Sequence, residues 1–137
     1  MENKLKHLEF IQNIITRMNT NSFQIKGMSI TITAALLALT ASDYNILYVS
    51  IAYFSLFIFW GLDAYYLSKE KGYRELYEEV RGLTEVNIDF NLKLKKEYTE
   101  GTNSWNHTLL NKTIWMLYSL QAIIALVLIL VFKYYAK

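Results

Sequence analysis

Three long stretches of the chain contain no Asp, Glu, Lys or Arg, and they constrain the fold more than any other feature. They are residues 27–42, 44–62 and 113–132, of 16, 19 and 20 residues. Together they make up 55 of 137 residues, more than a soluble chain of this size can bury. Because about 20 apolar residues cross the hydrocarbon core of a bilayer, the stretches predict three transmembrane helices. An ordinary soluble globular enzyme is excluded.

The composition leaves few kinds of chemistry open. The chain has no cysteine, which excludes disulfides, thiolate metal sites and cysteine nucleophiles. Its two histidines, His7 and His107, are far apart, and no metal-binding or glycine-rich phosphate-binding motif is present. A net charge of +2 is too small to indicate nucleic-acid binding. We therefore expect no enzyme activity, no metal, no cofactor and no nucleic-acid partner.

The pattern predicts an all-α protein that forms a single membrane domain over residues 1–137. Proline, which interrupts helices, is absent. The expected segments are an amphipathic cytoplasmic helix over 1–20, a first transmembrane helix over 23–42, a second over 44–66 that continues in the cytoplasm to 81, an extended cytoplasmic segment over 83–103, and a third transmembrane helix over 105–133.

The first 20 residues have apolar side chains at helical spacing on one side. This helix either packs on the cytoplasmic surface of its own protein or lies in the membrane interface. The run from Asn19 to Ser22 then interrupts the pattern with side chains that cap helices, so a second helix is expected to begin there. The apolar side consists of Leu5, Leu8, Ile11, Ile15 and Met18.

A polar stripe follows one side of the first span. Its hydroxyls either bond back to their own helix while the stripe packs on a neighbouring helix, or they line a pore in an oligomer. In the third span, Gln121 is the one strongly polar residue at mid-depth, and we expect it to donate a hydrogen bond between helices, with ion selection as the alternative. The stripe consists of Lys26 and the candidate pore-lining residues Ser29, Thr33, Leu36 and Thr40.

The basic residues predict the orientation in the membrane. Residues 1–26 and 63–112 carry 12 Lys and Arg, whereas the opposite flanks carry two. The positive-inside rule therefore places the N-terminus in the cytoplasm and the C-terminus outside. Lys26 and Asp63 then lie at the same depth, where they either form an ion pair at the cytoplasmic mouth of a pore or reach the headgroups independently.

Residues 86–94 alternate between apolar and polar side chains without a fault, which is typical of a strand with one buried face. A single strand cannot satisfy its own backbone groups. Either another copy of the chain supplies the partner strand, or the segment lies extended against the cytoplasmic helices.

Several short blocks, above all the FWGLDAYYL run from Phe59 to Leu67, carry a family resemblance. In these blocks the chain resembles a group of small bacterial membrane proteins, some of them similar to the transmembrane effectors of anti-phage defence systems. The resemblance implies a homo-oligomer in the bacterial inner membrane that damages the membrane on an infection-linked signal, often a nucleotide made by a partner enzyme. The other blocks are Arg17-Met18, Asn21 to Gly27, Glu70-Lys71, Tyr73 to Tyr77, Val86, Asp89-Phe90 and Ser104-Trp105.

The sequence thus favours a multi-pass, pore-forming effector, a ring of identical chains whose first transmembrane helices line the axis. The alternatives are a non-conducting accessory subunit that scaffolds a partner, and a holin-like lysis protein. If the trigger is an anionic nucleotide, basic residues would contact its phosphates and aromatic residues would stack on its base, although the same residues also fit a solvated surface. The candidates are Tyr73, Arg74, Tyr77, Arg81, Lys93 and Trp105, with Lys95 and Lys96 beside them.

Overall fold

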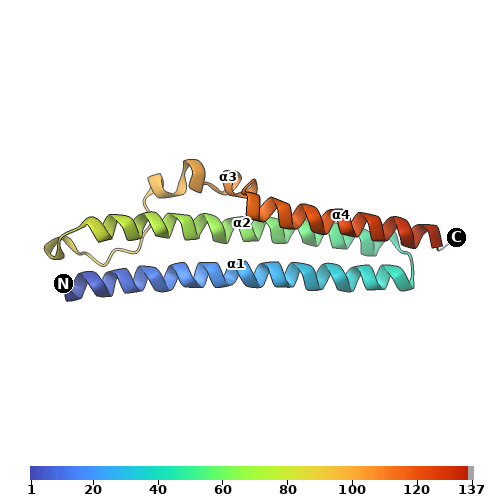
Figure 1. The fold of residues 1–137 in the computed structure, drawn as a ribbon, viewed down its shortest axis with the longest axis horizontal. Coiled ribbons are helices and arrows are strands. Elements are labelled where there is room, and N and C mark those ends of the chain that lie inside the picture. Colours follow the sequence, from blue (N-terminus) through green and yellow to red (C-terminus); the bar gives the residue numbers. More distant parts are fainter. Residues whose placement is uncertain (136–137) are drawn as a thin grey trace.

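The computed structural model describes residues 1–135 and is all-helical (Figure 1). Three of its helices are long and apolar enough to cross a membrane, which confirms the predicted fold class and the three candidate spans. The helices are α1 (Glu2–Ser42), α2 (Ile46–Gly82), α3 (Trp105–Leu109) and α4 (Lys112–Tyr135), with short 3₁₀ turns η1 (Glu85–Asn87), η2 (Lys96–Thr99) and η3 (Gly101–Asn103) between α2 and α3.

A long antiparallel hairpin of α1 and α2 forms the body of the molecule (Figure 1). Three residues connect the two helices, and the side chain of Asn45 accepts a hydrogen bond from the Leu47 amide at 2.9 Å, capping α2. At 1.5 Å per residue, α1 is about 60 Å long, which is twice the thickness of the hydrocarbon core. Half of the hairpin must therefore project beyond a membrane that the other half crosses.

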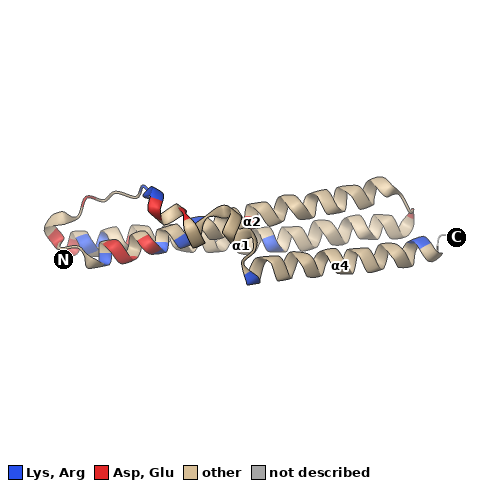
Figure 2. Ribbon diagram, turned by 90° about the horizontal axis from the view of Figure 1, so that it is seen from above, with Lys and Arg blue, Asp and Glu red and all other residues tan. Residues whose placement is uncertain are grey.

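Charge divides the rod into two halves (Figure 2). We call residues 1–26 and 63–111 the charged half, and residues 27–62 with α4 the apolar half. In the apolar half three helices lie together, because α4 runs beside the hairpin (Figure 2). In the charged half the hairpin is covered by the connection between α2 and α4.

The expected helix break at residues 19–22 does not occur, because α1 continues without interruption from Glu2 to Ser42. The capping-type side chains point inward and bond to α2 instead, with Asn19 donating to Glu70 and Ser22 donating to Asp63. Without a glycine or proline in the run, the backbone has no reason to leave the helix. The first 20 residues pack on the protein's own α2, where Ile11 and Ile15 are buried.

α2 runs unbroken from Ile46 to Gly82, close to the range expected from the sequence. The third helix differs, because the expected continuous helix over 105–133 is split into α3 and α4. The side chain of Asn111 accepts hydrogen bonds from the amide and hydroxyl of Thr113, which caps a new helix start. The indole of Trp60 donates to the Leu109 carbonyl at 3.0 Å, which satisfies an acceptor that the break releases.

Residues 84–95, which we call the strap, form no strand in this chain. The strap begins with η1 and then lies extended against α1 and α2, which is the second alternative left open by the alternating pattern. Ile88, Leu92 and Leu94 pack on the buried cluster of the charged half, but Val86 is 92% exposed. Phe90 adopts a positive φ of 56°, which redirects the backbone and ends the simple alternation.

Glu79 of α2 fastens the end of the strap. Its carboxylate accepts a hydrogen bond from Lys95 Nζ at 2.5 Å and another from the hydroxyl of Tyr98. These two donors, Lys95 foremost, lower the pKa of Glu79 below its ordinary value. A carboxyl group with a lowered folded-state pKa stabilises the fold above its unfolded pKa, and the contribution disappears as the pH falls through the folded value.

We predict that Glu79→Gln loosens residues 94–99. Hydrogen–deuterium exchange in this segment, corrected for intrinsic rates, should become about 3- to 10-fold faster at pH 7, as expected for the loss of a partly exposed ion pair. In the wild type the same loosening should begin only below about pH 4.3, the ordinary pKa of glutamate. Glu75→Gln is the matched control, because Glu75 is exposed on the same helix. Equal exchange in the two variants would contradict the assignment.

Candidate functional site

A buried carboxylate lies where the two halves of the rod meet. Asp63 on α2 is 0% exposed. Its oxygens accept hydrogen bonds from Ser22 Oγ at 2.5 Å, Lys26 Nζ at 2.7 Å and the Tyr118 hydroxyl at 3.2 Å. Lys26 forms the ion pair with Asp63 and keeps 27% of its side chain exposed. Each partner comes from a neighbouring helix, so the carboxylate joins α1, α2 and α4 at one point.

Helical spacing places these groups together. Ser22 and Lys26 are four residues apart and therefore lie on the same face of α1, and Lys26 Nζ also bonds to Ser22 Oγ at 2.8 Å. A buried charge without partners would cost several kcal/mol, so the ion pair and the two hydroxyls offset the desolvation of Asp63. The two residues that the sequence placed at one depth thus meet inside the bundle.

The polar stripe of α1 lies inside this chain. Ser29 is 0% exposed and donates to Gln121 Oε1 at 3.0 Å, so Gln121 accepts the interhelical bond instead of donating it as expected. Thr40 bonds back to the Leu36 carbonyl at 2.9 Å, and Thr33 is buried. We call the line of Ser29, Thr33 and Gln121 between α1 and α4 the polar seam. In the single chain the candidate pore residues therefore face a neighbouring helix, with Leu36 half-buried beside them.

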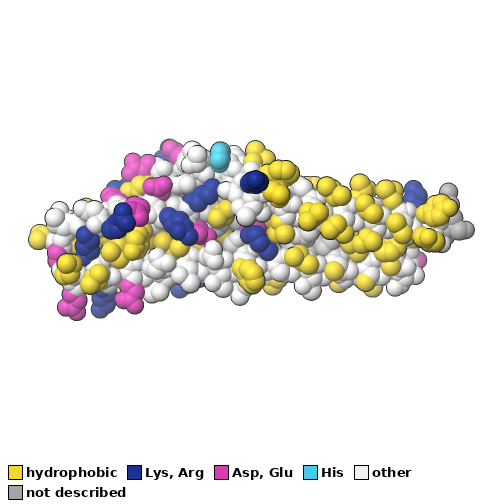
Figure 3. All heavy atoms as spheres, in the orientation of Figure 1, with side chains coloured by type: hydrophobic (Ala, Val, Ile, Leu, Met, Phe, Trp, Pro, Cys, Tyr) yellow, Lys and Arg dark blue, Asp and Glu magenta, His cyan; other side chains and the backbone are white. Residues whose placement is uncertain are grey.

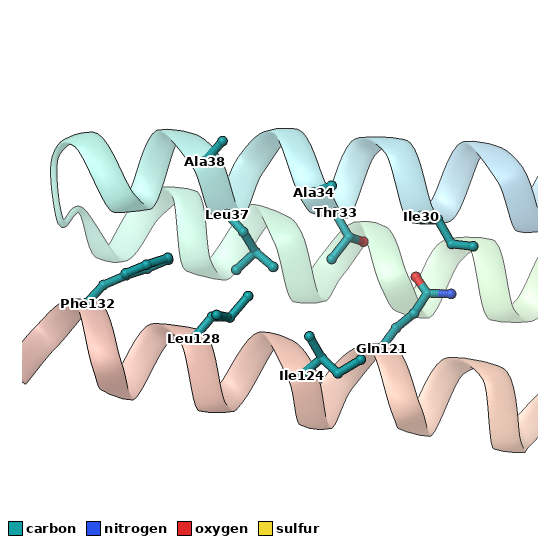
Figure 4. A pocket seen from close by; sticks show the side chains of 9 residues that line it. All are labelled: Ile30, Thr33, Ala34, Leu37, Ala38, Gln121, Ile124, Leu128 and Phe132. Atoms are coloured by element: carbon teal, nitrogen blue, oxygen red, sulfur yellow. The ribbon is translucent and has the colours of Figure 1, made fainter.

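An apolar groove of about 340 Å³ opens along the same junction of α1 and α4. Figure 4 shows the side chains of both helices pointing toward each other across it, with Thr33 and Gln121 at one end and Phe132 at the other. The packing between α1 and α4 is therefore incomplete next to the polar seam. The remaining residues of the groove are Ile30, Ala34, Leu37, Ala38, Ile124 and Leu128.

The candidate ligand-binding residues do not meet in one place. Trp105 donates to the Gly61 carbonyl at 2.9 Å, whereas Arg74 is 13 residues further along the same continuous helix, a distance of about 20 Å. Arg74 pairs with Glu70 and Arg81 with Glu78, so both guanidinium groups already have carboxylate partners. Tyr73 and Tyr77 pack against the core cluster, and Lys93, Lys95 and Lys96 are exposed.

Three contributors to the interior were missed from the sequence. His7 is 0% exposed and its Nε2 lies 3.1 Å from the Asn91 carbonyl of the strap. Glu70 is buried and holds Arg74, and Tyr118 completes the Asp63 cluster. The signal for His7 was its position four residues before Ile11, on the same buried face of α1. Within residues 1–135, no group of three or more His, Asp or Glu is placed to hold a metal ion.

Comparisons with protein families, with curated proteins and with solved structures found no match. The site must therefore be interpreted from its own geometry. It consists of a buried ion pair at the boundary of the apolar half, and a polar seam that continues from that boundary between α1 and α4.

We predict that Asp63→Leu destabilises the protein by about 3 kcal/mol, because it leaves the Lys26 ammonium and the Tyr118 hydroxyl without their acceptor. The double variant Lys26→Met/Asp63→Leu should recover at least half of this loss. Reversible unfolding in detergent micelles, followed by tryptophan fluorescence, measures both. Asp43→Leu in the exposed connection between α1 and α2 is the control. Additive single effects of Lys26→Met and Asp63→Leu would show that the two residues are not coupled.

Proposed function

We propose that the chain is the subunit of a homo-oligomeric membrane effector that opens a pore through the cytoplasmic membrane. The polar seam is the observation that carries this proposal. Polar side chains at mid-depth in a membrane helix are costly when they face lipid, and they commonly mark a water or ion path. Ser29, Thr33 and Gln121 are enclosed between α1 and α4 here, so this arrangement corresponds to a closed state.

The weak attachment of α4 supports movement at the seam. Only four of the 24 residues of α4 are buried, namely Ile114, Tyr118, Ala125 and Ile129. The groove leaves part of its contact with α1 unfilled. Separating α4 from α1 would expose the hydroxyls of α1, and in a ring of chains this hydroxylated face would line the axis. The break at Leu110 and Asn111 gives α4 a hinge where it joins α3.

The cluster around Asp63 would anchor the moving parts. Because Asp63 bonds to both α1 and α4, it holds their charged-half ends together while the seam opens beyond it. In the proposed orientation the charged half, with 12 of the 14 Lys and Arg residues, lies in the cytoplasm. A trigger acts there only if it binds the open arrangement better than the closed one. The infection-linked nature of that trigger rests on the resemblance to anti-phage effectors alone.

A disulfide across the seam tests the pore. The chain has no cysteine, so Ser29→Cys/Gln121→Cys introduces the only two thiols, at positions whose side chains touch at 3.0 Å. We predict that liposomes with the wild type release an encapsulated dye, that the oxidised double variant releases at least about tenfold less, and that reduction restores release, because the disulfide prevents α4 from leaving α1.

The single variants Ser29→Cys and Gln121→Cys, treated with the same oxidant, control for loss of the polar groups. Release from the oxidised double variant at the wild-type rate would show that the pore does not open at this seam. No release from the wild type, together with no toxicity on expression, would instead favour the non-conducting accessory subunit.

A further inference from the structure

The groove between α1 and α4 contains two buried polar groups without a partner. Among the described residues 1–135, the Thr33 hydroxyl and the Gln121 amide nitrogen form no hydrogen bond. Thr33 is only 6% exposed, and both side chains line the groove (Figure 4). In a membrane a lipid chain cannot supply the missing hydrogen bonds, so an occupant with a polar group of its own is favoured at this depth.

The wall of the groove is shaped for a helix. Ala34 and Ala38 are four residues apart on α1 and both line the groove, and this spacing of small side chains allows the backbone of another helix to approach closely. Side chains of α1 and α4 line both sides, and the opening faces away from α2 (Figure 4). The buried polar groups and the small residues thus point independently to a polar-bearing transmembrane helix.

We propose that α2 of a second copy of this chain docks in the groove, an inference that rests on the proposed homo-oligomer. α2 packs on both α1 and α4, so its outer face points away from its own groove. That face carries large exposed apolar side chains at steps of four, three and four residues, which is the spacing of one helix face. The apolar half of the rod is covered with such side chains (Figure 3). The face consists of Leu47, Ile51, Phe54 and Ile58.

Depth in the membrane supports the same pairing. Copies inserted in one orientation present equal residues at equal depth. Within the chain, Leu37 packs with Val49 and Tyr53, so Thr33 lies level with residues near position 55 of α2. Ser55 is half-buried beside the apolar face of α2 and carries a hydroxyl that can pair with Thr33 or Gln121 of the neighbour. Because groove and outer face lie on different sides of one chain, the contact is head-to-tail and builds a ring.

Disulfide formation between copies tests the docking. The variant Ala38→Cys/Ile51→Cys places one thiol in the groove and one on the outer face of α2 at similar depth. Oxidation in membranes should give a ladder of cross-linked chains on a non-reducing gel, with at least about tenfold more product than Ala35→Cys/Ile51→Cys. Ala35 is the matched control, since it is exposed on α1 but does not line the groove.

A second measurement separates docking from folding. Ala38→Trp should fill the groove and reduce the assembled fraction at least about tenfold in mass photometry of detergent particles, whereas Ala35→Trp should assemble like the wild type. Gln121→Leu should weaken assembly by about 3- to 15-fold, the usual range for one interhelical hydrogen bond. Circular dichroism of each variant checks that the helices are retained.

The outcomes distinguish this inference from the proposed function. Dimers from Ala38→Cys alone would mean that groove faces groove, and a monomeric wild type that carries a bound lipid in native mass spectrometry would assign the groove to lipid; either result overturns docking of α2. A ladder without dye release would retain the docking and reject the pore. Dye release by a monomeric Ala38→Trp variant would retain the pore and reject the docking.

Discussion

The carboxylate of Asp63 fixes the relative position of all three membrane-spanning helices. A charge buried to this degree cannot be tolerated without partners, and its partners come from α1 and α4. Sliding α1 by one turn along α2 would remove Lys26 and Ser22 from reach, and sliding α4 would remove Tyr118. The ion pair thereby determines the register in which the polar seam and the groove are formed.

The two halves of the rod are stabilised by different forces. In the charged half, water surrounds the hairpin, and burial of Ile11, Ile15, Leu76 and Val80 is driven by the hydrophobic effect. In the apolar half, lipid solvates outward-facing side chains as well as a neighbouring helix does, so association depends on close packing and hydrogen bonds. Helix α4 has few of either beyond its bond to Ser29. Its loose packing follows from this difference in solvent.

The proposed closed state and the proposed docking of α2 involve the same junction. A neighbouring helix that enters the groove would satisfy Thr33 and Gln121, and it would also press between α1 and α4. Assembly and opening would then be coupled, because both act on the contact between these two helices. The unbroken α1 and α2 extend from this junction to the strap, so a ligand that displaces the strap acts on the same rigid rods.

The sequence by itself determined the membrane-spanning stretches, since about 20 uncharged residues cannot be solvated otherwise, and it placed Lys26 level with Asp63 through the same count of residues. It did not determine whether Asn19 to Ser22 interrupt a helix, because a side chain that can cap can equally bond sideways to a neighbour such as Glu70. The break at Asn111 and the extended strap were likewise decided by tertiary contacts, with Trp60 holding the freed carbonyl and His7 lying beside that of Asn91. Periodicity specifies which side of a helix is polar, but only packing decides whether that side meets α4, another copy of the chain or water.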